Sequence, residues 1–370
     1  MRILILNWRD IKNPRAGGAE RVTHEHAKAW IKAGHEVIQF SASFKGALPE
    51  ETIDGVKIIR RGRYFTVHFW ALVYFLLGRF GPIDLVIDEF HFTPFLTPLY
   101  FRKAKKVALI FEVARDVWFA NWPFPLALAG YLVEPWLFRF YRQVPFITDS
   151  PSTKKDLIGC GIKEGQITII YPGISAPFLK RTPAETKEPI VLFVGYLSPD
   201  KGIKAAIDAF ALIKKEQPRA KFWIVGKGKN RFVRKLEKRA VDLGLSKEVK
   251  FWGFVSEDQK WTLMKKACLL IHPSQREGWG MVVIEANAMG TPVVGYDVPG
   301  LRDSIQDGET GVLTKKNDPT HLAQEVVRLL KDQKKYHRLR KKAWERSKKF
   351  RWARVTKESL QLIERIGGGK

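Results

Sequence analysis

A buried strand, a loop and an amphipathic helix follow one another in residues 190–210, which read IVLFVGYLSPDKGIKAAIDAF. The first five residues are all apolar, as in a strand of a parallel sheet that is covered on both faces. After the loop, apolar side chains recur at the spacing of one helical face, at Ile203, Ala206, Ile207 and Phe210. This strand–loop–helix unit predicts an α/β fold.

The same alternation of strands and helices continues on both sides of this unit. Downstream, we predict a helix over residues 202–215 and strands at Lys221–Val225, Val249–Phe251, Leu269–Ile271 and Pro292–Gly295. Upstream, we predict strands at Arg2–Leu6, Val37–Phe40, Leu85–Ile87, Val107–Phe111 and Phe146–Thr148. Two series of this kind indicate two Rossmann-like halves.

A proline-rich connection separates the two series. Its interior, Lys180–Glu188, is polar, as expected of an interdomain linker, and it is punctuated by Pro172, Pro177, Pro183 and Pro189. We therefore expect an N-terminal domain over residues 1–175 and a C-terminal domain over residues 176–345. Residues 346–370 are predicted to contain a helix that packs back toward the N-terminal domain.

The composition is that of a soluble globular protein, with 370 residues of which 45% are hydrophobic and 28% charged. The two cysteines, Cys160 and Cys268, cannot build a disulfide framework, which favours a reducing compartment. The N-terminal MRILILN predicts a core strand and not a signal peptide. The apolar stretch over residues 64–77 is shorter than the roughly 20 residues of a membrane-spanning helix. We therefore expect a cytoplasmic protein.

Positive charges exceed negative charges by 26, and the excess is unevenly spread. Residues 331–354 hold twelve Lys and Arg residues against Asp332 and Glu345, a net of +10. Such a run can be a solvated face, or it can bind an anionic membrane surface or nucleic acid. Nucleic acid is the least favoured of these alternatives, because aromatic stacking motifs of the RNA-binding type are missing.

Residues 276–286, which read REGWGMVVIEA, combine the features of an anion-binding site with two carboxylates. They follow a predicted strand and open a helix, whose first N–H groups favour a phosphate. Gly278 and Gly280 let the backbone approach a ligand closely. Glu285 lies about 7 Å along the helix axis, a reasonable step from a phosphate to a ribose. Glu277 stays in the loop, on the side where a sugar would hang from the diphosphate.

This run resembles the E-x7-E signature of retaining GT-B glycosyltransferases, and Glu-Gly-Trp-Gly…Glu-Ala is similar to glycosyltransferase family 4. The resemblance implies two Rossmann-like domains that face each other across a cleft and a nucleotide-diphosphate sugar as donor. It implies that Glu277 is catalytic and contacts hydroxyls of the donor sugar, while Glu285 holds the ribose. The intervening residues would contact sugar and phosphate: Gly278, Trp279, Gly280 and Met281.

Three further loops resemble donor-binding parts of the same family. Gly195–Gly202 resembles the phosphate loop, in which Lys201 matches a catalytic lysine that binds the pyrophosphate. Residues 15–20 resemble a glycine loop that meets the donor from the opposite domain, and residues 251–255 resemble the loop beside the nucleotide base. These loops add the expected donor contacts Gly17, Gly18, Gly195, Gly253, Phe254 and Val255.

The phosphate loop departs from the family pattern at Tyr196, where the family usually carries an arginine. One of two expected cationic contacts to the diphosphate is therefore missing. Either Lys201 acts alone, or Lys227 or Arg276 substitutes for the arginine.

A second departure is Phe111, which stands where the family commonly carries an active-site histidine. His91 and His24 are alternative replacements, although a lone histidine is more often structural. Glu112 and Asp116 follow the same strand and would instead position the acceptor. The acceptor-side candidates are therefore Glu112, Asp116 and His91.

Metal-dependent chemistry is not predicted, because the sequence has no Asp-x-Asp triplet and no cluster with metal-ligand spacing. We expect no cofactor, since the nucleotide sugar is a co-substrate. The family resemblance implies retention of the anomeric configuration. The two glutamates of the motif look like ligand-binding residues, which favours front-face substitution, with the departing phosphate oxygen helping to deprotonate the acceptor hydroxyl.

Three N-terminal stretches are rich in aromatic residues, at 60–70, 118–124 and 136–142, and the first and third also carry arginines. They suit an interfacial membrane surface, while core packing or a dimer contact is the alternative. We favour a lipid-linked or cell-envelope glycan as acceptor and peripheral attachment to the inner face of an anionic membrane. The alternative functions are another GT-B enzyme, such as a phosphorylase or a nucleotide-sugar epimerase, and, ranked lower, a basic nucleic-acid-binding protein.

Overall fold

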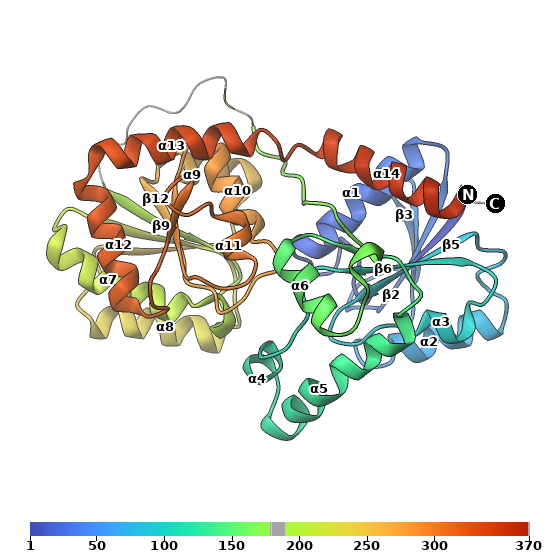
Figure 1. Ribbon diagram of the computed structural model, residues 1–370. Helices are drawn as coiled ribbons and strands as arrows, with labels where there is room; N and C mark the ends of the chain where they lie inside the picture. The colour runs from blue at the N-terminus through green and yellow to red at the C-terminus, as the bar shows by residue number, and fades with distance from the viewer. Residues whose placement is uncertain (178, 180–188, 369–370) are drawn as a thin grey trace. The chain divides into compact units, whose positions relative to one another are not determined.

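The chain forms two compact units (Figure 1). The computed structural model describes residues 1–177, 179 and 189–368. Unit 1 comprises Met1–Gly173 together with Trp352–Lys370, and unit 2 comprises Ile174–Arg351. The expected boundaries after residues 175 and 345 lie close to these divisions. The expected polar linker, Lys180–Glu188, lies outside the described residues.

Unit 1 contains an eight-stranded sheet in the order β3-β4-β2-β1-β5-β6-β7-β8. Neighbouring strands are parallel except for the antiparallel pair β3–β4. Because β2 lies on one side of β1 and β5 on the other, the strand order reverses between β1 and β5. The strands are β1 (Arg2–Leu6), β2 (Glu36–Ser41), β3 (Glu50–Ile53), β4 (Val56–Arg60), β5 (Leu85–Phe90), β6 (Lys105–Ile110), β7 (Phe146–Thr148) and β8 (Ile167–Ile169).

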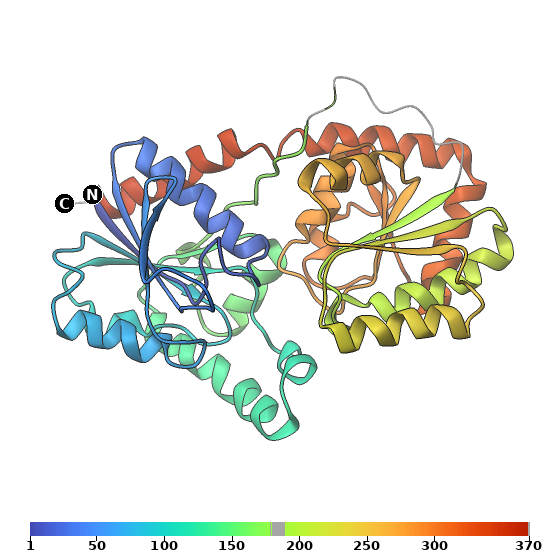
Figure 2. The same ribbon diagram turned by 180° about the vertical axis from the view of Figure 1, so that it is seen from behind.

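Helices cover both faces of this sheet. Successive side chains of β1 point to opposite faces, so their packing partners show which helices cover each face. Ile3 and Ile5 pack with α1 (Gly18–Lys32) and α14 (Trp352–Gly368), whereas Leu4 and Leu6 pack with α2 (Val67–Leu76). Trp30 of α1 donates a hydrogen bond from Nε1 to Ser359 Oγ of α14, over 3.1 Å. Figure 2 shows α1 and α14 side by side. The C-terminal helix therefore belongs to the core of unit 1.

The remaining helices of unit 1 lie between β4 and β8. They are α3 (Thr97–Tyr100), α4 (Val117–Asn121), α5 (Phe124–Leu137), α6 (Pro151–Gly159) and the 3₁₀ turns η1 (Phe138–Tyr141) and η2 (Glu164–Gln166). Among the described helices of the whole chain, none combines the length and the apolarity that crossing a bilayer requires.

Unit 2 contains a six-stranded parallel sheet in the order β11-β10-β9-β12-β13-β14, so its strand order reverses between β9 and β12. Its strands are β9 (Ile190–Val194), β10 (Lys221–Val225), β11 (Val249–Gly253), β12 (Leu269–His272), β13 (Val293–Gly295) and β14 (Gly311–Leu313). Its helices are η3 (Pro199–Lys201), α7 (Ile203–Glu216), α8 (Asn230–Asp242), α9 (Glu257–Lys266), α10 (Met281–Ala288), α11 (Leu301–Ser304), α12 (Pro319–Lys331) and α13 (Gln333–Ser347).

The predicted α/β class with two Rossmann-like halves is confirmed, and every predicted strand is present with small shifts at its ends. Part of the basic run over residues 331–354 has a structural role within α13. Arg340 is buried and donates from Nε to the Gly290 carbonyl over 3.0 Å, just beyond the end of α10. Arg346 lies with its guanidinium carbon 5.8 Å from the centre of the Trp279 ring.

Candidate active site

Lys201 and Glu277 meet where the sheet of unit 2 reverses its strand order. Lys201 follows β9, and Glu277 follows the neighbouring strand β12. Lys201 Nζ lies 2.7 Å from Glu277 Oε1. In open α/β sheets, ligands bind beyond the carboxyl ends of the strands at such a reversal. The two residues predicted to be catalytic therefore form an ion pair at the expected place in the fold.

Backbone contacts hold the loop of Lys201 against the loop of Glu277. Gly202 has a φ of +69°, and a Cβ atom there would lie only 1.8 Å from the carbonyl oxygen of Pro273. Only glycine permits both this conformation and this approach. The Gln275 amide also donates to the Asp200 carbonyl over 2.8 Å. The position of Lys201 is thus set by the backbone of the loop that carries Glu277.

Two residues that the sequence did not single out also bind the Glu277 carboxylate. Ser274 Oγ donates to Glu277 Oε1 over 2.7 Å, and His272 Nε2 lies 3.0 Å from the same oxygen. Burial would raise the pKa of Glu277, but the charge of Lys201 and the hydrogen bond from His272 outweigh it and hold the pKa well below its ordinary value. The carboxylate is therefore ionised, and one of its oxygens is already engaged.

The loop after Glu277 opens helix α10 at Gly280, which has a φ of +78°. The first N–H groups of a helix have no acceptor within it and carry partial positive charge, which suits an anion. The Trp279 side chain is buried and packs against Phe350 with ring centres 5.5 Å apart. Any contact of Trp279 with a ligand would therefore involve its backbone, as the sequence analysis expected.

Glu285 lies in α10 and is paired with a lysine from another helix. Lys260 of α9 places Nζ 3.0 Å from both carboxylate oxygens of Glu285, which is buried. Sequence reasoning missed Lys260, because no local pattern links two residues that are 25 positions apart. The structure thus gives each predicted ligand-binding glutamate its own lysine.

The two loops expected at the phosphate and the base also lie close to each other. Lys227 accepts a backbone hydrogen bond from Leu197, over 2.8 Å, and its Nζ lies 5.3 Å from the ring centre of Phe254. Phe254 is 77% exposed, and Tyr196 is 41% exposed. Of the two residues considered as substitutes for the missing arginine, Lys227 therefore lies against both loops.

Unit 1 gathers its own polar side chains at the reversal between β1 and β5. The Gly17 amide donates to Glu20 Oε2 over 2.7 Å, and this contact caps α1 beside the glycine loop; Gly18 begins the helix. Glu89, in β5, accepts hydrogen bonds from Asn7 and Thr23 over 2.6 and 2.8 Å. Sequence reasoning missed Glu89, because a glutamate inside an apolar strand shows its burial only in three dimensions.

His91 follows β5 and pairs with Glu89 over 2.9 Å. Burial lowers the pKa of His91 to about 3, so its ring is neutral at neutral pH. Burial also raises the pKa of Glu89 well above its ordinary value. The pair therefore favours neutral side chains, in contrast to the charged pair of unit 2.

Glu112 and Asp116, the other acceptor-side candidates, follow the neighbouring strand β6 and so lie toward the same edge of the sheet as His91. Glu112 is half-buried, and Asp116 is exposed at the start of α4. His24 is held elsewhere, since its Nε2 lies 2.9 Å from Asp54 in the β3–β4 turn. Phe111 packs against the hydrophobic core.

Among the described residues, no group of three or more His, Cys, Asp or Glu side chains is arranged to hold a metal ion. Lysines lie beside three of the candidate donor residues: Lys201 beside Glu277, Lys227 beside Phe254 and Lys260 beside Glu285.

Two family models match consecutive parts of the chain. The family described as Glycosyltransferase Family 4 matches residues 16–176, which include Glu20, Glu89 and His91. The family described as Glycosyl transferases group 1 matches residues 176–346, which include Lys201, Glu277 and Glu285.

Relatives and solved structures agree with these matches. An uncharacterized glycosyltransferase of Methanocaldococcus jannaschii is 33% identical over 198 residues, which span 54% of this chain and 53% of that protein. Sucrose-phosphate synthase from Thermosynechococcus elongatus superposes with a TM-score of 0.83 at 20% identity, covering 100% of both chains. The Anabaena protein HepE, solved with UDP-glucose, gives a TM-score of 0.76 at 20% identity over 98% of this chain and 99% of that one. The two units thus match glycosyltransferase family models in turn, and the chain has the GT-B fold of these solved structures.

Proposed function

We propose that this protein transfers a hexose from a nucleoside-diphosphate hexose to an acceptor hydroxyl, with retention of configuration and without a metal ion. The observation that carries the proposal is the Lys201–Glu277 ion pair at the strand-order reversal of unit 2, with Glu285 in the helix that follows. HepE, a neighbour in fold, was solved with UDP-glucose, which makes this compound the first donor to test.

Each charged group has a role that its position supports. Lys201 and the amino end of α10 neutralise the diphosphate, whose negative charge grows as it leaves. Glu277 accepts hydrogen bonds from hydroxyls of the hexose through the carboxylate that Lys201 and Ser274 orient. Glu285, oriented by Lys260, binds the ribose hydroxyls. A lysine thus takes the place of a divalent cation beside the diphosphate.

Front-face substitution fits these assignments. The bond between the anomeric carbon and the phosphate oxygen breaks, the acceptor oxygen bonds to the same face, and its proton passes to the departing phosphate. A double displacement would need a carboxylate free to attack the sugar. Glu277 is poorly suited to that role, because three side chains contact its Oε1. Product stereochemistry, read from the anomeric proton coupling, tests the mechanism; an inverted linkage would exclude it.

On the acceptor side, we propose a lipid-linked or cell-envelope glycan that binds near His91, Glu112 and Asp116. The protein would work as a peripheral protein at the inner face of an anionic membrane. The supporting observation is that these candidates follow β5 and β6, neighbouring parallel strands of unit 1.

Thermal unfolding in the presence of UDP-, GDP- and ADP-hexoses tests the proposed donor. A donor at 100 times its Kd adds about 2.7 kcal/mol to the free energy of unfolding, which is a readily measured rise in Tm. We expect one nucleotide series to stabilise the protein without added metal and in the presence of a chelator. Lys201→Met, which keeps the length of the side chain, should lose most of the shift. If no nucleotide sugar raises the Tm, the proposal fails.

A further inference from the structure

Unit 1 exposes large apolar side chains on and beside helices α2 and α5. Among the described residues, seven large hydrophobic side chains are more than 60% exposed, and the candidate base-loop residue Phe254 is one of them. The other six lie on or beside these two helices and are called here the apolar face: Phe65, Phe69, Leu76, Leu77, Phe124 and Leu132. Soluble monomers rarely expose so many large apolar groups in one region without a function.

Helices α2 and α5 carry almost no charged residues on their exposed sides. No charged residue occurs between Arg63 and Arg79, a stretch that includes the whole of α2. Helix α5 has one charged residue, Glu134, and its carboxylate turns inward to accept hydrogen bonds from the backbone amides of Ala114 and Arg115 over 2.7 and 2.9 Å. The outward side of α5 is left apolar, although a helix of 14 residues is too short to span a bilayer.

Aromatic contacts join the two helices into one surface. Phe65, just before α2, lies against Trp122, just before α5, with ring centres 5.8 Å apart. Phe119 of α4 continues the surface to Phe124, with ring centres 6.5 Å apart. Figures 1 and 2 show α2, α4 and α5 on the side of unit 1 away from α14. The aromatic side chains at the starts of α2 and α5 therefore adjoin one another.

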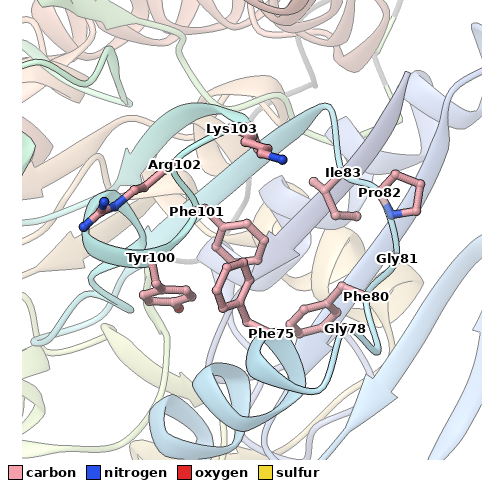
Figure 3. Close-up of a pocket in the computed structure, with 11 residues that line it drawn as sticks. Phe75, Gly78, Phe80, Gly81, Pro82, Ile83, Tyr100, Phe101, Arg102 and Lys103 are labelled. Carbon is pink, nitrogen blue, oxygen red and sulfur yellow. The ribbon is translucent and has the colours of Figure 1, made fainter.

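A cavity of about 610 Å³ opens beside the end of α2. Aromatic rings of Phe75, Phe80, Tyr100 and Phe101 line it, and Figure 3 shows Arg102 and Lys103 beside these rings. Its lining residues precede β5 and β6, so the cavity lies at the amino ends of these strands, whereas the candidate site lies at their carboxyl ends. An apolar cavity of this size accommodates a hydrocarbon chain.

The exposed charges of the segment that carries the apolar face are mostly positive. Between residues 61 and 143, the exposed carboxylates are Asp84 and Asp116. The exposed cations of the same segment are Arg63, Arg79, Arg102, Lys103, Lys105, Arg139 and Arg142. Two copies of this face would repel each other, whereas an anionic bilayer would attract it. Arginines that flank aromatic and aliphatic side chains are also typical of interfacial helices.

We propose that the apolar face of unit 1 docks on an anionic phospholipid bilayer. Its side chains enter the boundary between head groups and acyl chains, the flanking arginines contact lipid phosphates, and the cavity beside Arg102 and Lys103 receives one acyl chain. This docking rests on the proposed membrane-linked acceptor and names the surface that contacts the membrane. It is tested without sugar transfer, so that the two proposals can fail separately.

Flotation of the full-length protein with vesicles tests the docking. Vesicles of phosphatidylglycerol and phosphatidylcholine should bind the protein at low salt, and pure phosphatidylcholine should bind it at least about tenfold less. The double variants Leu76→Glu/Leu77→Glu and Phe124→Glu/Leu132→Glu should each weaken binding by more than about tenfold, because they place charge in the apolar layer. The matched control is Leu48→Glu/Val241→Glu, at two side chains that are each 60% exposed outside the face, and it should bind like the unaltered protein.

Two results would overturn the proposal. One is equal flotation of the face and control variants; the other is a dimer in light scattering that the face variants dissociate, without vesicle binding. The thermal shift with a nucleotide sugar should be the same in all variants, which shows that they are folded. A protein that floats but shows no rise in Tm with a nucleotide sugar supports the docking face and contradicts the proposed function. A protein that shows the rise in Tm but does not float supports the proposed function and contradicts the docking face.

Discussion

Glu277 in unit 2 and Glu89 in unit 1 are largely buried glutamates, each beside the point where the strand order of a parallel sheet reverses. Their pKa values nevertheless move in opposite directions. Burial would raise both, but beside Glu277 the charge of Lys201 prevails and the pKa falls well below its ordinary value. Beside Glu89 burial prevails and the pKa rises well above it.

The difference follows from the neighbours and not from the position in the fold. Glu277 has a lysine in hydrogen-bonding contact, whereas Glu89 binds the neutral groups Asn7 and Thr23 and the pKa-lowered His91. Arg9, the cation near Glu89, is bound to Glu20 over 2.7 Å. Unit 2 thus holds a charged lysine–glutamate pair, while unit 1 holds a buried neutral acid beside a neutral imidazole. Substitutions at four positions test this contrast.

Replacing Glu277 should have the largest effect. We expect Glu277→Ala to lower kcat/KM by about 10³-fold, because contacts to the reacting sugar are lost at the place where charge develops. The fold should remain intact, since the partner Lys201 is partly exposed and can be solvated. Kinetics with the best donor and far-UV circular dichroism measure the two effects. Glu309→Ala, at an exposed glutamate, is the control, and turnover of Glu277→Ala near the control value would remove Glu277 from the site.

Replacing Lys201 should affect both activity and stability. We expect Lys201→Met to lower kcat/KM by about 10²-fold and the free energy of unfolding by about 2 kcal/mol, because Glu277 loses its counter-charge. The folded-state pKa of Glu277 is depressed, so its contribution to stability is present above pH 4.5 and is lost as the pH falls through the folded-state value. The stability difference between the two proteins should therefore shrink below pH 4.5.

The double variant Lys201→Met/Glu277→Gln separates these effects. It removes both charges, so it should recover most of the lost stability without recovering activity. Denaturant unfolding at several pH values gives the free energies of unfolding of the unaltered protein, of Lys201→Met and of the double variant. A double variant as unstable as Lys201→Met would mean that the charge of Glu277 does not cause the loss.

Replacing Lys260 should have a smaller effect, confined to binding. Lys260 contacts Glu285, which is proposed to bind the ribose and not the reacting sugar. We expect Lys260→Met to raise the KM for the donor about tenfold and to change kcat less than about twofold, the pattern of lost uniform binding. Lys265→Met, at an exposed lysine of the same helix, is the control. A loss confined to kcat would contradict the assignment.

Apolar runs are local signals, so the sequence predicted ten of the strands; Lys201 and Glu277, which the family resemblance predicted as site residues, lie in contact. The sequence failed at the β3–β4 hairpin, although its turn carries the Asp54-Gly55 pair that favours such hairpins. The strand before that turn, Glu50–Ile53, is polar and lies at the sheet edge, so it lacks an apolar pattern. Contacts between distant segments could not be predicted, as with Lys260 and Glu285.

Glu89→Gln should have the smallest effect, and the effect should depend on pH. Glutamine resembles the protonated acid, since its oxygen can accept hydrogen bonds from Asn7 and Thr23 while its amide donates to neutral His91.

The raised folded-state pKa means that the stability contributed by Glu89 is full below its unfolded value of 4.5 and is lost as the pH rises toward the folded value. Near pH 4.5, the free energies of unfolding of Glu89→Gln and of the unaltered protein should differ by less than about 1 kcal/mol. As the pH rises, the free energy of unfolding of the unaltered protein should fall relative to that of the variant, by up to about 1.4 kcal/mol per pH unit. This fall should stop once the pH passes the folded-state pKa of Glu89. Urea unfolding between pH 4.5 and 9 measures this slope, with the surface variant Glu50→Gln as control. A difference that does not change with pH would show that Glu89 is ionised in the folded protein, and the contrast with Glu277 would disappear.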